Sequence, residues 1–193
     1  DYYDGMVDDL KELKERFGLN YRLHNYFPPP KKHFVFNLAS LDRAIADASI
    51  EHAKRAIDLS RQLESLKLAF HAGFFIPLGS EEIGKDISSR KLYDEEEAVN
   101  CFVGNLQSLQ TFAGDEFQIY IENNVVSVRN LERFPERSPS MLNNYQDYID
   151  LKKQVDFSLL LDVAHLKVSC RAQGLLFEEQ LYKLVECTDY LHV

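Results

Sequence analysis

The stretch FQIYIENN, residues 117–124, is an apolar run that stops abruptly at one acidic and two amide side chains. The stretch FSLLLDVAH, residues 157–165, repeats the pattern, with Asp162 at the end of the apolar run. Between them lie a loop rich in Pro, Ser and Arg and a segment of helical periodicity at 142–153. Strands separated by such long crossovers pair in parallel, because a short turn cannot reach a parallel neighbour. The two stretches therefore predict an α/β fold with a parallel sheet.

The same alternation of strand and helix extends along the whole chain. Apolar runs predict strands at 21–23, 66–70, 117–121 and 157–161 and a fifth that opens at 190. Amphipathic segments predict helices at 6–17, 41–66, 95–112, 142–153 and 175–187. Two architectures fit, a doubly wound open sheet and a (β/α)8 TIM barrel. The first strand is not followed by a Gly-rich phosphate loop, which disfavours the nucleotide-binding sheet.

Composition narrows the class of protein. The 193 residues suffice for a single domain, and 45% hydrophobic with 12% aromatic residues argue against disorder. A net charge of -9 disfavours a general nucleic-acid binder, and no apolar run reaches the roughly 18 residues of a membrane helix. Three scattered cysteines without CxxC spacing indicate reduced thiols in a cytoplasmic protein. The chain starts without Met and stops inside a predicted strand, so we expect residues 1–193 to be one domain that is incomplete at both ends.

Each predicted strand ends at a side chain that can bind a metal ion. These residues are His24, His71, Glu122, Asp162 and His192. A lone His or Asp at a strand end is usually a cap or a loop hydrogen-bonding group, but here all five strands share the feature. In a parallel barrel the carboxyl ends of the strands meet at one rim, where active sites are built. The pattern therefore favours the barrel and predicts a shared site, whose nitrogen and oxygen ligands suit Zn, Mn, Co or Fe better than Ca.

Three further residues near the strand ends are candidates for substrate binding. His165 follows Asp162 in a D-x-x-H element, and it faces the site only if the chain turns after Asp162. It would then bind a second metal or a substrate oxygen; the alternative is a loop histidine bonded to backbone. Asn124 and Lys167 are the other candidates, although a solvated lysine is the simpler interpretation of Lys167. His52 is interpreted as an ordinary helix residue.

The runs LHNYFPPP, LAFHAGFF, IYIENN, LLLDVAHLKVS and YLHV resemble, in that order, strands two to six of the xylose isomerase-like TIM-barrel superfamily. That superfamily includes sugar (phosphate) isomerases and epimerases and apurinic endonucleases of the endonuclease IV type. The resemblance implies Glu122, Asp162 and His192 as metal ligands. It also matches His24 and His71 to zinc ligands of the endonuclease branch. Strands one, seven and eight, and with strand eight a second catalytic glutamate, have no counterpart in this sequence.

The resemblance leaves three functions open, each with a divalent metal (Zn, Mn, Co or Mg). The first is isomerisation or epimerisation of a sugar or sugar phosphate, with Glu122 as ligand and base and His165 on a substrate hydroxyl. The second is zinc-dependent hydrolysis of DNA at abasic sites, which His24 and His71 favour and the acidic charge opposes. The third is a non-catalytic barrel that binds a metal or a sugar. No membrane partner is expected, and a homo-oligomer stays open.

Overall fold

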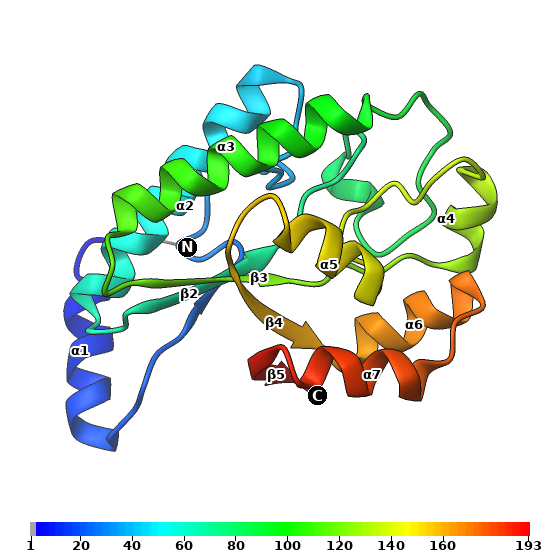
Figure 1. Ribbon diagram of the computed structural model, residues 1–193. Coiled ribbons are helices and arrows are strands. Elements are labelled where there is room, and N and C mark those ends of the chain that lie inside the picture. The colour runs from blue at the N-terminus through cyan, green and yellow to red at the C-terminus, as the bar shows by residue number, and fades with distance from the viewer. Residues whose placement is uncertain (1–2) are drawn as a thin grey trace.

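The computed structural model describes residues 3–193, which form a five-stranded parallel sheet with helices beside it (Figure 1). The strands are β1 (Leu23–His24), β2 (Lys67–His71), β3 (Gln118–Glu122), β4 (Ser158–Asp162) and β5 (Thr188–His192). Their order in the sheet is β1-β2-β3-β4-β5, and every neighbouring pair is parallel. Consecutive parallel strands in sequential order form the arc of a (β/α)8 barrel, so the predicted fold class is confirmed.

The helices provide the crossovers between the strands. They are α1 (Met6–Phe17), α2 (Arg43–Gln62), α3 (Glu95–Ala113), α4 (Val128–Arg133), α5 (Tyr145–Lys152), α6 (Val163–Gln173) and α7 (Phe177–Val185), with a short 3-10 helix at Ser80–Glu82. The long helices α2 and α3 lie side by side in Figure 1, and α6 and α7 pack together near β4 and β5. No helix within residues 3–193 is both long and apolar enough to cross a membrane.

The helices differ from the sequence-based expectation in several places. Helix α2 begins after Asp42, whose carboxylate accepts a hydrogen bond from the Ala44 amide, and covers residues 43–62 where a helix at 41–66 was expected. Helix α6 was not predicted, since only a turn after Asp162 was considered. Asp162 caps α6, and Gly174 ends it in the left-handed region at φ 68°. The segment predicted as one helix at 175–187 is therefore the shorter α7.

The two faces of the sheet have different neighbours. Side chains such as Phe70, Ile121 and Leu161 belong to the large core between the sheet and the helices. Ala69, Tyr120 and Leu160, with Tyr190 packed against them, form a separate cluster on the other face. Because side chains alternate along a strand, the residues two positions further along β2, β3, β4 and β5 lie on that same face. Those residues are the last of each strand.

Strand register brings these last residues to one edge of the sheet. His71 is paired with Glu122 between β2 and β3, and Asp162 is paired with His192 between β4 and β5. The chain after β2 turns closely against its neighbours at Gly73, where a Cβ atom would lie 2.5 Å from the Ala39 Cβ atom. Only glycine fits this approach, which keeps the loop against the strand ends.

Candidate metal centre

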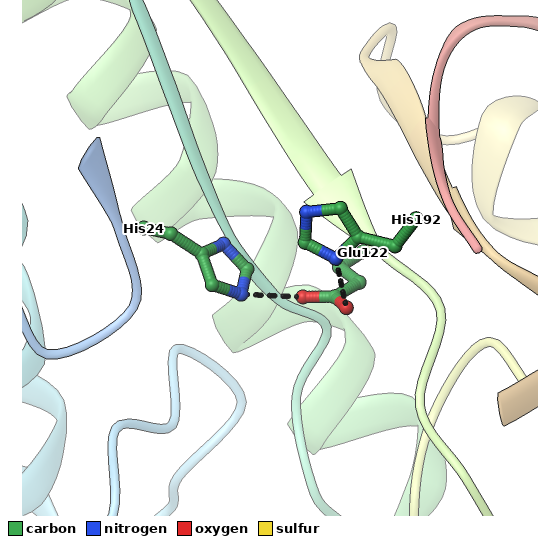
Figure 2. Close-up of side chains that lie close together, drawn as sticks. All are labelled: His24, Glu122 and His192. Atoms are coloured by element: carbon green, nitrogen blue, oxygen red, sulfur yellow. Dashed lines mark ion pairs between the residues drawn. The ribbon is translucent and has the colours of Figure 1, made fainter. Parts of the chain in front are cut away.

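Glu122, at the end of β3, lies at the centre of a cluster of histidines although only 1% of it is exposed. Its Oε2 atom lies 2.9 Å from His24 Nε2 and 3.3 Å from His71 Nδ1. Its Oε1 atom lies 3.4 Å from His192 Nδ1 and 3.8 Å from His165 Nδ1. Figure 2 shows His24 and His192 each paired with a different one of the two carboxylate oxygens. Four imidazoles therefore share one buried carboxylate.

The cluster contains two groups of three residues whose ligand atoms lie within 4.8 Å of one another. One group is His24, Glu122 and His192; the other is His71, Glu122 and His165. Each consists of two imidazoles and a carboxylate, and Glu122 belongs to both. The predicted convergence of strand-end side chains is present in the structure, and a second cation position beside the first is geometrically feasible.

Asp162 connects the two groups. Its Oδ1 atom accepts a hydrogen bond of 2.7 Å from the backbone amide of His165, and its Oδ2 atom lies 3.8 Å from His192 Nδ1. Because α6 begins directly after Asp162, the first turn of the helix brings His165 back toward Glu122. The His165 Nδ1 atom lies 3.0 Å from the carbonyl oxygen of Asn123, to which it donates as the N–H tautomer, leaving Nε2 with a free lone pair.

Burial and charge set the protonation states at the centre. Burial raises the pKa of Glu122, but interactions with His24, His71 and His165 outweigh it and hold this pKa below its usual value. Burial also lowers the pKa of His71 to about 4, against the opposing charge of Glu122. At neutral pH the carboxylate is ionised and the His71 ring is neutral, and these are the forms that bind a cation.

Several buried polar atoms of the cluster lack a hydrogen-bond partner among residues 3–193, namely Glu122 Oε2, His24 Nδ1 and His71 Nδ1. Asn25 explains part of this. Its side-chain oxygen accepts the His71 amide at 3.1 Å, so its NH2 group donates to His24 Nε2 at 2.7 Å. His24 Nε2 then has no proton to share with Glu122 Oε2. Because a cation that takes the place of the Asn25 NH2 group at His24 Nε2 would relieve this contact with Glu122 Oε2, the residues fit a divalent metal with nitrogen and oxygen ligands.

Asn25 and His52 are supporting residues that sequence reasoning missed. Asn25 has a positive φ of 44°, and its carbonyl oxygen lies 3.1 Å from His52 Nε2. His52 is a residue of α2, as expected, and it is only 2% exposed. Burial lowers the pKa of His52, and the neutral ring donates to Asn25. The available signals were an amide directly after His24 and the position of His52 beside the apolar face of α2.

Asn123 supports the centre from the other side. Its amide group bonds the backbone of Asp162 twice, through Oδ1 to the Asp162 N–H at 2.7 Å and through Nδ2 to the Asp162 carbonyl at 3.0 Å. These bonds tie the ends of β3 and β4 together, where Glu122 and Asp162 must lie close to each other.

The other two candidate residues, Asn124 and Lys167, make their contacts outside the histidine cluster. Asn124 is 3% exposed, and its amide nitrogen donates to the carbonyl oxygens of Ala72, Gly73 and Met141. These hydrogen bonds connect the loop after β2 to the segment before α5. Lys167 is exposed on α6 and its ammonium lies over the ring of Phe177, 5.7 Å from the centroid. The structure does not bring Lys167 to the cluster.

Comparisons with known proteins agree with this geometry. Residues 1–192 match the family model described as xylose isomerase-like TIM barrel. A D-tagatose 3-epimerase-like protein has a similar structure, with a TM-score of 0.68 and 17% identity over 99% of this chain and 62% of its own. D-psicose 3-epimerase from Clostridium cellulolyticum H10, solved with D-tagatose, is also similar. Its TM-score is 0.66 and its sequence identity 15%, over 99% of this chain and 58% of its own.

The IOLI protein, solved with a bound zinc atom, is a further structural neighbour, with a TM-score of 0.57 and 15% identity over 84% of this chain and 48% of its own. No curated protein matches the sequence. The chain thus spans less than two thirds of the length of these structures, and at such identities the likeness shows the fold.

Proposed function

The chain belongs to the xylose isomerase-like TIM barrel family, and from this premise we propose that it is a divalent-metal-dependent isomerase or epimerase of a sugar or sugar phosphate. The observation that supports the proposal most directly is the buried, ionised Glu122 shared by four imidazoles at the carboxyl ends of the strands. Structural neighbours named as tagatose and psicose 3-epimerases support a sugar as substrate.

His24, His71, Glu122 and His192 would hold the metal, with Asp162 beside them. The bound cation supplies a positive charge that polarises a substrate carbonyl and stabilises the negative charge that develops on its oxygen. Glu122 is the candidate base within this chain. In the proposed step the C–H bond next to the carbonyl breaks, its proton moves to a Glu122 oxygen, and its electron pair moves toward the carbonyl oxygen.

His165 positions the substrate in this proposal. Since its Nδ1 atom donates to the Asn123 carbonyl, its Nε2 atom is available to accept a hydrogen bond from a substrate hydroxyl. Returning the proton to the opposite face of the same carbon gives an epimer, and returning it to the neighbouring carbon gives an isomer. The position of the substrate hydroxyls therefore decides the product.

A second candidate function is zinc-dependent cleavage of a phosphodiester at abasic sites. The observation that favours it is the second group, His71, Glu122 and His165, which would allow two cations to share one carboxylate. The net charge of -9 opposes it, because a phosphodiester backbone is repelled by an acidic protein.

The test combines metal analysis with proton exchange. Metal content is measured by elemental mass spectrometry on untreated protein, and exchange by NMR of ketoses incubated with it in D2O. We expect about one bound divalent metal per chain and deuterium at the carbon next to a carbonyl. Glu122→Gln should abolish exchange and lower metal content, while the exposed control Glu116→Gln should change neither. Full metal content and exchange in Glu122→Gln would refute the site. About three zinc ions with cleavage of abasic DNA would select the second function.

A further inference from the structure

A cavity of about 690 Å³ opens directly beside the histidine cluster. His71 and His165 form one end of its wall, and the two rings are 5.4 Å apart between centroids. The remaining wall comes from the loop after β1, the loop after β2, the segment leading into α4 with the first residues of α4, and α6. Cavities of about 300–1,000 Å³ hold ligands of drug size, and about 150 Å³ already holds a benzene ring. This cavity is therefore large enough for a sugar unit together with a bulky substituent.

Away from the histidines the wall is predominantly apolar. Buried or half-buried Phe36, Phe74, Leu78 and Ile87 line it. Exposed apolar side chains surround it as well: Ile83 at 51%, Val125 at 40%, Val128 at 42% and Val168 at 45% exposure. A single exposed apolar residue needs no explanation, but several that converge on one cavity indicate a binding site for an apolar group.

The wall is built before any ligand arrives. Asn130, on α4, is 8% exposed and accepts the backbone amide of Ile87 through Oδ1 at 2.9 Å. Its Nδ2 atom donates to the Lys85 carbonyl at 3.1 Å. These bonds fix the loop after β2 against α4. A preformed wall binds its ligand without the entropy cost of ordering a loop.

The charged groups of the cavity wall offer few cationic partners to an anionic substituent. Glu82 pairs with Arg90, and Asp86 lies 3.3 Å from Arg129, so both acids are neutralised. Lys85 has no ion-pair partner among residues 3–193, but it is a single exposed lysine on a loop. Tight phosphate binding uses several converging donors, and one lysine does not provide them.

We infer that the cavity binds an uncharged apolar substituent, aryl or long alkyl, carried by the sugar substrate. This inference rests on the proposed function, since the reacting part of the substrate lies at the cluster while the substituent lies against Val168 and its neighbours. The substrate class is then a sugar conjugate with an apolar group, in preference to a free or phosphorylated monosaccharide.

Binding of matched ligands tests the inference without requiring turnover. Isothermal titration calorimetry of the metal-loaded protein compares methyl with phenyl glycosides of glucose, galactose, mannose and xylose, and includes glucose 6-phosphate. For at least one sugar, the phenyl glycoside should bind about tenfold tighter than the methyl glycoside, because the ring buries apolar surface. Val168→Asp should abolish that difference. Val185→Asp, at an equally exposed valine of α7 outside the cavity, should leave it intact.

Equal affinities within every methyl and phenyl pair would overturn the inference, as would preferential binding of glucose 6-phosphate or the absence of any binding. The same data separate this inference from the proposed function. Proton exchange in free ketoses without a preference for phenyl glycosides would keep the function and reject the apolar site. Preferential binding of phenyl glycosides by a protein that exchanges no proton would keep the site and reject the function.

Discussion

Burial and the neighbouring histidines shift the pKa of Glu122 in opposite directions, and their balance decides whether its side chain is ionised. Burial alone would favour the protonated acid, whereas the neighbouring imidazoles favour the carboxylate and hold its pKa below the usual value. The identity of this residue was predictable, because an acidic side chain at the end of an apolar run stands out in the sequence. The role of Asn25 was not, since it depends on the backbone amide of His71, which lies 46 residues away in the chain.

The structure predicts that Asn25 positions the metal ligands. In Asn25→Gly the backbone keeps its positive φ without strain, but the His71 amide at the end of β2 loses the side-chain oxygen that accepts from it. Supporting residues of this kind typically change metal affinity by about 10–100-fold. We expect a loss of about tenfold in zinc affinity, measured by competition with a chromogenic chelator. The exposed Asn20→Gly is the control, and unchanged affinity in Asn25→Gly would contradict the role.

Among the elements, strands and long helices followed from the sequence, whereas the loops did not. The strands end where the apolar runs end, so the edge that carries the candidate metal ligands could be derived from the apolar runs and the residue that ends each of them. Helix α6 was missed because its start depends on the Asp162 cap, whose carboxylate also faces the site. The cavity wall formed by the loop after β2 and by α4 has no periodic signal, because buried polar bonds such as those of Asn130 hold it together.

The loop after β2 gives a prediction of pH-dependent stability. Despite the opposing effect of burial, hydrogen bonds from the Gly79 and Ser88 amides and the contact with Arg90 lower the pKa of Glu82 to about 2. A carboxyl with a lowered pKa stabilises the fold above its unfolded pKa of 4.5, and this contribution is lost as the pH falls toward 2. Glu82→Gln should therefore cost about 2 kcal/mol at pH 7.

The comparison is made by urea unfolding between pH 7 and pH 2. The difference in unfolding free energy between the protein and Glu82→Gln should shrink below about pH 4.5. The neighbouring Glu81 is exposed, and Glu81→Gln should show no such difference at any pH. A gap that stays constant down to pH 2 would show that the ionised carboxylate is not the stabilising form.

At the scale of the whole molecule, the cluster joins all five strands. His24, His71, Glu122, Asp162 and His192 come from β1 to β5, so a bound cation would link every strand of the sheet at one edge. A ligand that binds only the folded state raises stability by an amount that grows with its concentration, about 2.7 kcal/mol at one hundred times its Kd.

Metal should therefore raise the melting temperature of the protein, and a chelator should lower it. For a domain of this size, about 2.7 kcal/mol corresponds to a rise of several degrees. Differential scanning calorimetry with added zinc or manganese, before and after EDTA treatment, measures the shift. Glu122→Gln should lose the response and Glu116→Gln should keep it. An equal shift in both variants would place the bound metal elsewhere.

The division between strand ends and loops has a consequence for engineering. The side chains of the histidine cluster belong mainly to the strands, whereas the apolar wall belongs to the loops after β1 and β2, the segment before α4 with the first residues of α4, and α6. Under the proposed function, new specificities can be sought by library mutagenesis of Ile83, Val125, Val128 and Val168 while every candidate metal ligand is retained. The same separation then makes this scaffold a starting point for directed evolution, in which substrate preference changes and the chemistry stays the same.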